Sequence, residues 1–145
     1  MMLPDVNVLI YAHREEAIDH GAYRSWTENL INSDHAYALS DLVLSGFLRI
    51  VTHPRILNPP SSAKSAWSFV REIRDRPNCV GIQPGPRHWE IFARLCRESR
   101  SKGNRIPDAY LAALAIESGC EWITTDRDFS RFRGLRWRHP LHQTG

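Results

Sequence analysis

Short apolar runs alternate along this chain with longer segments in which apolar residues recur every three or four positions. Each run has only three or four residues, which is short for a helix and typical of a buried strand. The runs are Met1–Leu3, Ala36–Leu39, Cys79–Ile82, Glu121–Thr124 and Leu135–Trp137. Because these strands alternate with helical segments, the sequence predicts an α/β domain with a mostly parallel central sheet flanked by helices.

The periodic segments predict the helices. Their apolar stripes cover Ala22–Leu30, Leu42–Ile50, Ala66–Ile73 and Trp89–Cys96. Another helix is expected from Ile106 to Gly119, because proline suits a first helical turn and glycine suits the left-handed residue after a helix. A short helix is expected over Asp128–Phe132. Pro4 conflicts with a central strand, so we expect the first ladder to end just before Asp5.

Length and composition set the class of protein. The 145 residues suit one domain with a single core, which we expect to span residues 1–145. No apolar run approaches the ~20 residues that cross a bilayer, and no basic-then-apolar leader opens the chain. The three cysteines are an odd number without close spacing, so we expect free, buried thiols in a reducing environment. These features predict a cytoplasmic protein with no membrane partner.

Positive charge is unevenly distributed. The net charge is only +3, yet residues 127–138 hold five arginines and one acid. A second basic stretch, Arg97–Arg105, holds four cations and one glutamate. Two basic clusters on a small domain favour a phosphate-bearing partner, although a solvated surface remains the alternative. If RNA is that partner, the residues expected to hold its backbone are Arg105, Arg127, Arg131, Arg133 and Arg136.

Three acids are expected to meet at one edge of the sheet. Asp5 follows the first predicted strand, Asp126 follows the fourth, and Asp108 lies at the start of the helix that precedes the fourth strand. In a parallel α/β unit, a helix begins at the edge where the strands end, which is also where ligands bind. Carboxylates that converge there repel one another unless a cation lies between them. The pattern therefore predicts a Mg²⁺ or Mn²⁺ site.

Each acid also has an ordinary structural explanation. Asp108 is favourable in a first helical turn because of the helix dipole, and Asp126 and Asp128 suit a turn that caps a short helix. Asp5 is harder to explain in this way because it directly follows an apolar strand. The histidines show no helical pair spaced for zinc, so we interpret them, His88 included, as surface residues.

Several segments of the chain resemble PIN-domain ribonucleases. Met2–Leu9 (MLPDVNVL) is similar to their opening motif, Pro107–Ala115 (PDAYLAALA) to the third acidic motif, and Thr124–Phe129 (TTDRDF) to the fourth. Leu44–Arg55 (LSGFLRIVTHPR) and the closing segment Phe132–Leu141 resemble VapC toxins of bacterial toxin–antitoxin pairs. The resemblance covers nearly the whole chain, and the motifs keep the family's order and spacing.

The resemblance implies a PIN-like fold and a metal-dependent endoribonuclease that cleaves RNA. It also implies a VapB-like antitoxin as partner and a homodimer. The residues that match functional positions are the metal-binding acids Asp5, Asp108 and Asp126, the accessory catalytic acid Asp128, and the polar neighbours Asn7 and Thr124. The segments Trp26–Ile31 and Leu42–Ile50 are candidates for a groove that receives an antitoxin helix, and both equally suit a core.

One position departs from the family pattern. The second acid of the family is usually a glutamate on the helix after the second strand, and Gly46 occupies that position here. Asp41 lies five residues earlier and so points elsewhere on a helix. The departure keeps a second hypothesis open, in which the chain is a catalytically weakened module that binds RNA or an antitoxin. A phosphatase of the haloacid dehalogenase type ranks last, because its chemistry needs a second Asp where this chain has Asn7.

Overall fold

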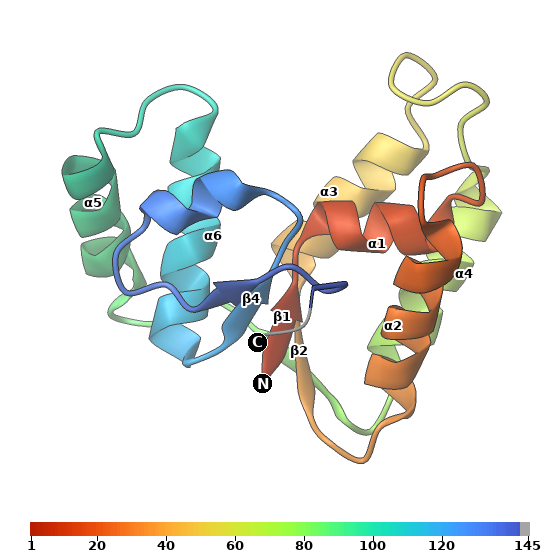
Figure 1. Cartoon of the computed structure of the whole chain (residues 1–145), viewed down its shortest axis with the longest axis horizontal. Coiled ribbons are helices and arrows are strands. Elements are labelled where there is room, and N and C mark those ends of the chain that lie inside the picture. Colours follow the sequence, from red (N-terminus) through yellow and green to blue (C-terminus); the bar gives the residue numbers. More distant parts are fainter. Residues whose placement is uncertain (143–145) are drawn as a thin grey trace.

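The computed structural model describes residues 1–142, which form an α/β domain (Figure 1). The described part contains five short strands, six α-helices and one 3₁₀ helix, η1. In chain order the elements are β1 (Met2–Pro4), α1 (Val6–His13), α2 (His20–Asn32), β2 (Tyr37–Ser40), α3 (Asp41–Val51), α4 (Ala63–Arg74), β3 (Cys79–Ile82), α5 (His88–Ser99), α6 (Arg105–Ser118), β4 (Glu121–Ile123), η1 (Arg127–Arg131) and β5 (Trp137–Arg138). The predicted strands and helices are thus present, with bounds shifted by a few residues at most.

Every strand pairing in the described residues is parallel, as predicted. One ladder has the order β1-β4-β5, and a second joins β2 to β3. β2 lies against β1, so the two ladders form one twisted layer (Figure 1). All the strands therefore end at the same edge of that layer.

Pro4 explains why the sheet is divided between β1 and β2. The backbone N–H of Asp5 donates to Ile123 at 2.8 Å, and the N–H of Glu121 donates to Met1 at 2.9 Å. Odd-numbered residues of β1 therefore bond to β4, and the nitrogen of Pro4 faces β2, where it has no hydrogen to donate. The ladder ends at Pro4, just before Asp5, as expected, and it tolerates the proline because the nitrogen of Pro4 faces the side of β1 that is not hydrogen-bonded.

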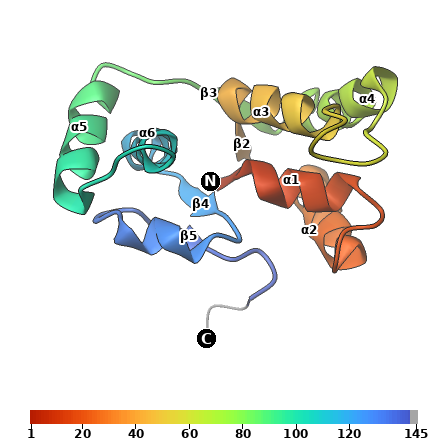
Figure 2. The ribbon, with the colours of Figure 1, turned by 90° about the horizontal axis from the view of Figure 1, so that it is seen from above.

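The helices form two groups around the sheet (Figures 1 and 2). α5 packs against α6 at one end of the molecule. α1 packs against α2 and α3, and α3 packs against α4, at the other end. The core between them contains large side chains that are fully buried, such as Leu3, Phe47 and Trp122. This packing fixes the strand ends relative to the starts of α1 and α6.

The sequence did not predict α1. Its residues, VNVLIYAH, are apolar on almost every position, so they show no stripe of helical period. Only Val8, Leu9 and Ala12 are buried, and the sequence signal that marks the helix is the capping residue Asp5 that precedes it. A segment that is apolar at nearly every position is compatible with either a strand or a helix. The capping residue Asp5 is the feature that indicates a helix here.

The structure also tests the expectations for Gly119, the cysteines and the histidines. Gly119 ends α6 in the left-handed region, with φ at 70°, as predicted. The cysteines are free, with Cys120 buried and the other two partly buried. His88 is not a surface residue: it is 2% exposed, and its Nε2 bonds to the carbonyl of Tyr110 at 2.9 Å. No helix of the described residues is long and apolar enough to cross a membrane.

Candidate active site

The register of β1 and β4 brings Asp5 and Thr124 together. Pro4 pairs with Ile123, so the next residue of each strand leaves the sheet at the same level. Asp5 is the N-cap of α1, and its Oδ1 accepts the Val6 N–H at 2.6 Å. Its Oδ2 accepts the Thr124 hydroxyl at 2.7 Å. Both residues are buried, so this carboxylate is held rigidly at the carboxyl edge of the sheet.

A chain of hydrogen bonds continues from Thr124 to the other acids. The Oγ1 of Thr124 also accepts the backbone N–H of Asp126, at 3.1 Å. Asp126 in turn caps η1, because its Oδ1 accepts the N–H of Asp128 at 2.9 Å. Asp126 is partly buried and Asp128 is exposed. Asp126 is thus a capping residue, as the ordinary explanation expected, whereas Asp128 lies within η1 and supplies the N–H that is capped; both belong to one network with Asp5.

Electrostatic coupling places Asp108 with the same group. It lies in the first turn of α6 and is partly buried. Burial raises the pKa of Asp108, and the charges of Asp126 and Asp128 raise it further. Burial is also the main reason that the pKa of Asp5 rises to about 6, with smaller contributions from Asp108 and Asp126. The edge of the sheet therefore gathers four carboxylates whose charges oppose one another.

These acids fit a hard divalent cation that keeps water in its shell. Among residues 1–142, no three His, Cys, Asp or Glu side chains are placed so that they could hold a metal ion together. Mg²⁺ needs only one or two protein carboxylates, because water and substrate phosphate complete its six ligands. The donors here are carboxylate oxygens, and a cation among them would offset both the burial and the smaller mutual repulsion that raise the pKa of Asp5 and Asp108. The chemistry of the donor set thus suits Mg²⁺ or Mn²⁺.

Two further positions lie beside Asp5. Asn7 is in the first turn of α1, and its Oδ1 is buried without a hydrogen-bond partner. Gly46 lies on α3, and a Cβ built on it is 3.9 Å from the Cγ2 of Val6, the residue after Asp5. The position that lacks the family's second acid therefore faces the start of α1, and a methyl group there makes only an ordinary van der Waals contact.

The predicted arginines do not form one group. Arg105 begins α6, where its charge lowers the pKa of Asp108, and Arg127 follows Asp126 in η1. Arg131 is held by Asp128, with Nε 2.8 Å from the Asp128 carbonyl. Arg136 donates to the carbonyl of Gly119 at 2.7 Å, at the opposite edge of the sheet from the acids. Arg133 lies in the exposed segment between η1 and β5.

A family model and curated relatives match nearly the whole chain. The model of the PIN domain matches residues 2–135. The chain belongs to the PIN-domain family. Ribonuclease VapC43 of Mycobacterium tuberculosis is 45% identical over 97% of this chain and 96% of its own length. Ribonuclease VapC25 of the same organism is 39% identical, over 97% and 99%. The resemblance to VapC ribonucleases found in the sequence is confirmed.

Solved structures share the PIN fold. VapBC2 from Rickettsia felis, bound to a DNA fragment from its promoter, aligns with a TM-score of 0.70 at 18% identity, over 95% of this chain and 97% of that one. VapC20 of Mycobacterium tuberculosis, described as a sarcin-ricin loop cleaving toxin, aligns with a TM-score of 0.62 at 16% identity, over 94% and 99%. At these identities the likeness concerns the fold, which is the expected α/β PIN-like domain.

Removing the buried charge is predicted to stabilise the metal-free PIN domain. The folded-state pKa of Asp5 is about 6, above its ordinary value of 3.8, so the folded protein favours the protonated acid. The free energy of unfolding contributed by this group is therefore highest below pH 4 and falls as pH rises to 6. At pH 8 Asp5→Asn should raise the free energy of unfolding by up to about 3 kcal/mol, a gain that disappears at pH 4. Denaturant unfolding in EDTA measures the difference, and a variant less stable than wild type at pH 8 contradicts it.

Thr124 is predicted to be required for the network. Thr124→Val keeps the shape of the side chain but leaves Asp5 Oδ2 without its donor and the Asp126 N–H without its acceptor. We expect a loss of about 1–3 kcal/mol in the free energy of unfolding. Thr124→Ser is the matched control, since it keeps the hydroxyl and should lose clearly less. Equal losses in the two variants would show that the methyl group, and not the hydrogen bonds, matters here.

Proposed function

We propose that this chain is an endoribonuclease, the toxin of a VapBC-like toxin–antitoxin pair, which hydrolyses RNA phosphodiester bonds. The observation that carries the proposal is the convergence of Asp5, Asp108 and Asp126 at the carboxyl edge of the sheet. The names of the VapC ribonucleases, which match along nearly the whole chain, support the same activity. The proposed substrate is RNA, and the proposed cofactor is Mg²⁺ or Mn²⁺.

Asp5, Asp108 and Asp126 are the residues proposed to hold the cation. When bound, it supplies a water of lowered pKa and neutralises charge that develops on the phosphate. Asp5 is fixed by Thr124 and Val6, so it offers an oxygen in a defined place without a reorganisation cost. Asp128 is exposed beside Asp126, with its Oδ1 3.5 Å from Arg131, and is proposed to orient the attacking water and to accept its proton.

The positive side chains near the acids have a different role. Arg105 and Arg127 are exposed and lie at the start of α6 and of η1, next to Asp108 and Asp126. We assign them to the RNA backbone, whose phosphates a cluster of carboxylates otherwise repels. Their contribution is electrostatic, so binding should weaken as salt rises.

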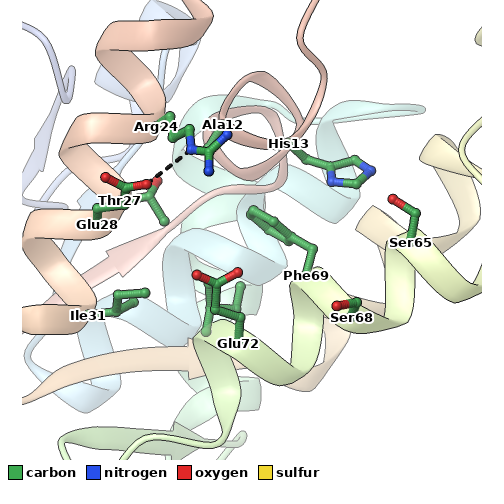
Figure 3. Close-up of a pocket in the computed structure, with 11 residues that line it drawn as sticks. Ala12, His13, Arg24, Thr27, Glu28, Ile31, Ser65, Ser68, Phe69 and Glu72 are labelled. Carbon is green, nitrogen blue, oxygen red and sulfur yellow. Dashed lines mark hydrogen bonds and ion pairs between the residues drawn. The ribbon is translucent and has the colours of Figure 1, made fainter.

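A VapB-like antitoxin and a second copy of this chain are the proposed protein partners. A cleft of about 240 Å³ lies between α1, α2 and α4, away from the acids (Figure 3). In it, Arg24 pairs with Glu28 at 3.0 Å, and Glu72 and Phe69 of α4 face them. A second, more apolar groove of about 600 Å³ lies between α3 and α4, where Trp67 is half exposed. Each groove includes part of a segment named above as a candidate for the antitoxin.

The alternative function is a weakened module that binds RNA or the antitoxin without efficient cleavage. Gly46 is the observation that favours it, because the position beside Val6 that a fourth carboxylate would fill carries none. Asp128 does not replace that carboxylate, since it belongs to η1 on another part of the edge. In the first function the protein cleaves RNA, and cleavage depends on the metal and on the acids. In the alternative the protein binds RNA or the antitoxin but does not cleave RNA efficiently.

Cleavage of RNA is the direct test. Purified protein is incubated with total cellular RNA and Mg²⁺ or Mn²⁺, beside an EDTA control and the variants Asp5→Asn and Asp108→Asn. We expect discrete fragments from the wild type, and at least a hundredfold slower cleavage in EDTA and in both variants, because each removes a part of the cation site. Glu98→Gln, an exposed change on α5, is the matched control and should cleave normally. Intact RNA from folded protein that still binds it would support the weakened module.

Restoring the family's second acid is predicted to strengthen the metal site. Gly46→Glu adds a carboxylate beside α1, and Gly46→Ala is its matched control for helix propensity. We expect Gly46→Ala to raise the free energy of unfolding by about 0.5–1 kcal/mol with unchanged activity. Gly46→Glu should lower the Mn²⁺ concentration needed for half-maximal cleavage several-fold. An unchanged metal requirement in Gly46→Glu would show that position 46 does not reach the site.

A further inference from the structure

The connection between α5 and α6 carries the least neutralised positive charge near the acids. We call Arg100–Arg105 the α5–α6 loop; its cations are Arg100, Lys102 and Arg105. All three are exposed, and within residues 1–142 none makes an ion pair or a side-chain hydrogen bond. In the neighbouring elements Arg94 pairs with Glu98 and Arg131 is held by Asp128, whereas Arg97 and Arg127 are also exposed and make no ion pair within residues 1–142.

The loop lies at the same end of the molecule as the acids. It leads directly into α6, whose first turn contains Asp108, and Figure 1 shows it above the start of that helix. The charge of Arg105 reaches Asp108, whose pKa it lowers. Arg136, expected from the sequence to bind RNA, is at the opposite edge of the sheet and bonded to Gly119. The available positive charge near the acids therefore includes the α5–α6 loop and excludes Arg136.

The backbone of the loop is well held. The N–H of Ser101 donates to Cys96 at 3.0 Å, and the N–H groups of Arg105 and Ile106 donate to Lys102 and Gly103. Arg100 is the left-handed residue that ends α5, with φ at 54°, a conformation that glycine adopts at lower cost. A fixed backbone places the three cations in advance, so that a ligand orders only their side chains.

We infer that the α5–α6 loop is a second subsite for substrate RNA, which binds the phosphates of nucleotides outside the bond that is cut. This inference rests on the proposed ribonuclease function. A strand whose scissile phosphate lies at Asp5 and Asp108 passes the start of α6 and meets Arg105, then Lys102 and Arg100. The subsite recognises the charge of the backbone and no base, so it sets the length of RNA that binds well rather than its sequence.

Binding of RNAs of two lengths tests the subsite. Fluorescence anisotropy in EDTA, which stops cleavage in all variants alike, compares labelled single-stranded RNAs of about 20 and about 4 nucleotides. The loop variant is Arg100→Gly with Lys102→Gln, which leaves Arg105 in place beside Asp108. The control variant, Arg71→Gln with Arg74→Gln, removes the same charge around the C-terminus of α4, where the helix leads back to the amino edge of the sheet. Arg100→Gly also relieves the left-handed arginine, so the loop variant should melt no lower than the control.

The expected result is specific to the loop and to length. The loop variant should bind the long RNA about tenfold or more weakly, while the short RNA and the control variant change little. The slope of log affinity against log salt should fall by about 1.4, because each of the two lost phosphate contacts contributes about 0.7 for a single strand. Equal binding by the loop variant, an equal loss in the control, or a wild type that does not bind RNA overturns the inference. Metal-dependent cleavage by the wild type is scored separately, so the proposed function stands if the loop variant binds and cleaves unchanged.

Discussion

The carboxylate of Asp5 is the group on which this edge of the molecule depends. It is buried at the end of β1, and it accepts one hydrogen bond from the start of α1 and one from Thr124 at the end of β4. Two strand ends and one helix start are therefore joined through a single side chain. The same burial makes its charge costly, and the nearby charges of Asp108 and Asp126 increase that cost. The domain thus keeps an unfavourable arrangement at the place where a cation and a phosphate are proposed to bind.

That arrangement links stability to function. An acid whose pKa is raised by burial lowers the stability of the folded protein at neutral pH, and a bound cation recovers the loss. The surrounding structure tolerates the cost because strand pairing and helix packing fix the acids independently of any ion. The basic residues are proposed to serve the opposite need, since the proposed RNA substrate would approach an edge that is otherwise negative. The cations of the α5–α6 loop, Arg105 among them, lie close to the acids without forming an ion pair with them.

The sequence predicted the fold and the acidic residues for identifiable reasons. Strand ends are marked by apolar runs, and parallel topology brings Asp5, Asp126 and the start of α6 to one edge. It missed α1, because a helix that is apolar all round has no period to detect. It misplaced His88, because a single histidine on an apolar helix face gives no signal of burial. Charge counts could not separate Arg136 from Arg127, because these residues of one basic stretch lie at opposite edges of the sheet.

The position of a bound cation tests the central claim most directly. Mn²⁺ is added to ¹⁵N-labelled protein, and the paramagnetic loss of backbone amide signals is mapped along the chain. The account predicts that the signals of residues near Asp5, Asp108 and Asp126 disappear first, and that Asp5→Asn requires a much higher Mn²⁺ concentration for the same effect. Loss centred elsewhere, for example on the stacked rings of His139 and His142, or loss unchanged by Asp5→Asn, would contradict it.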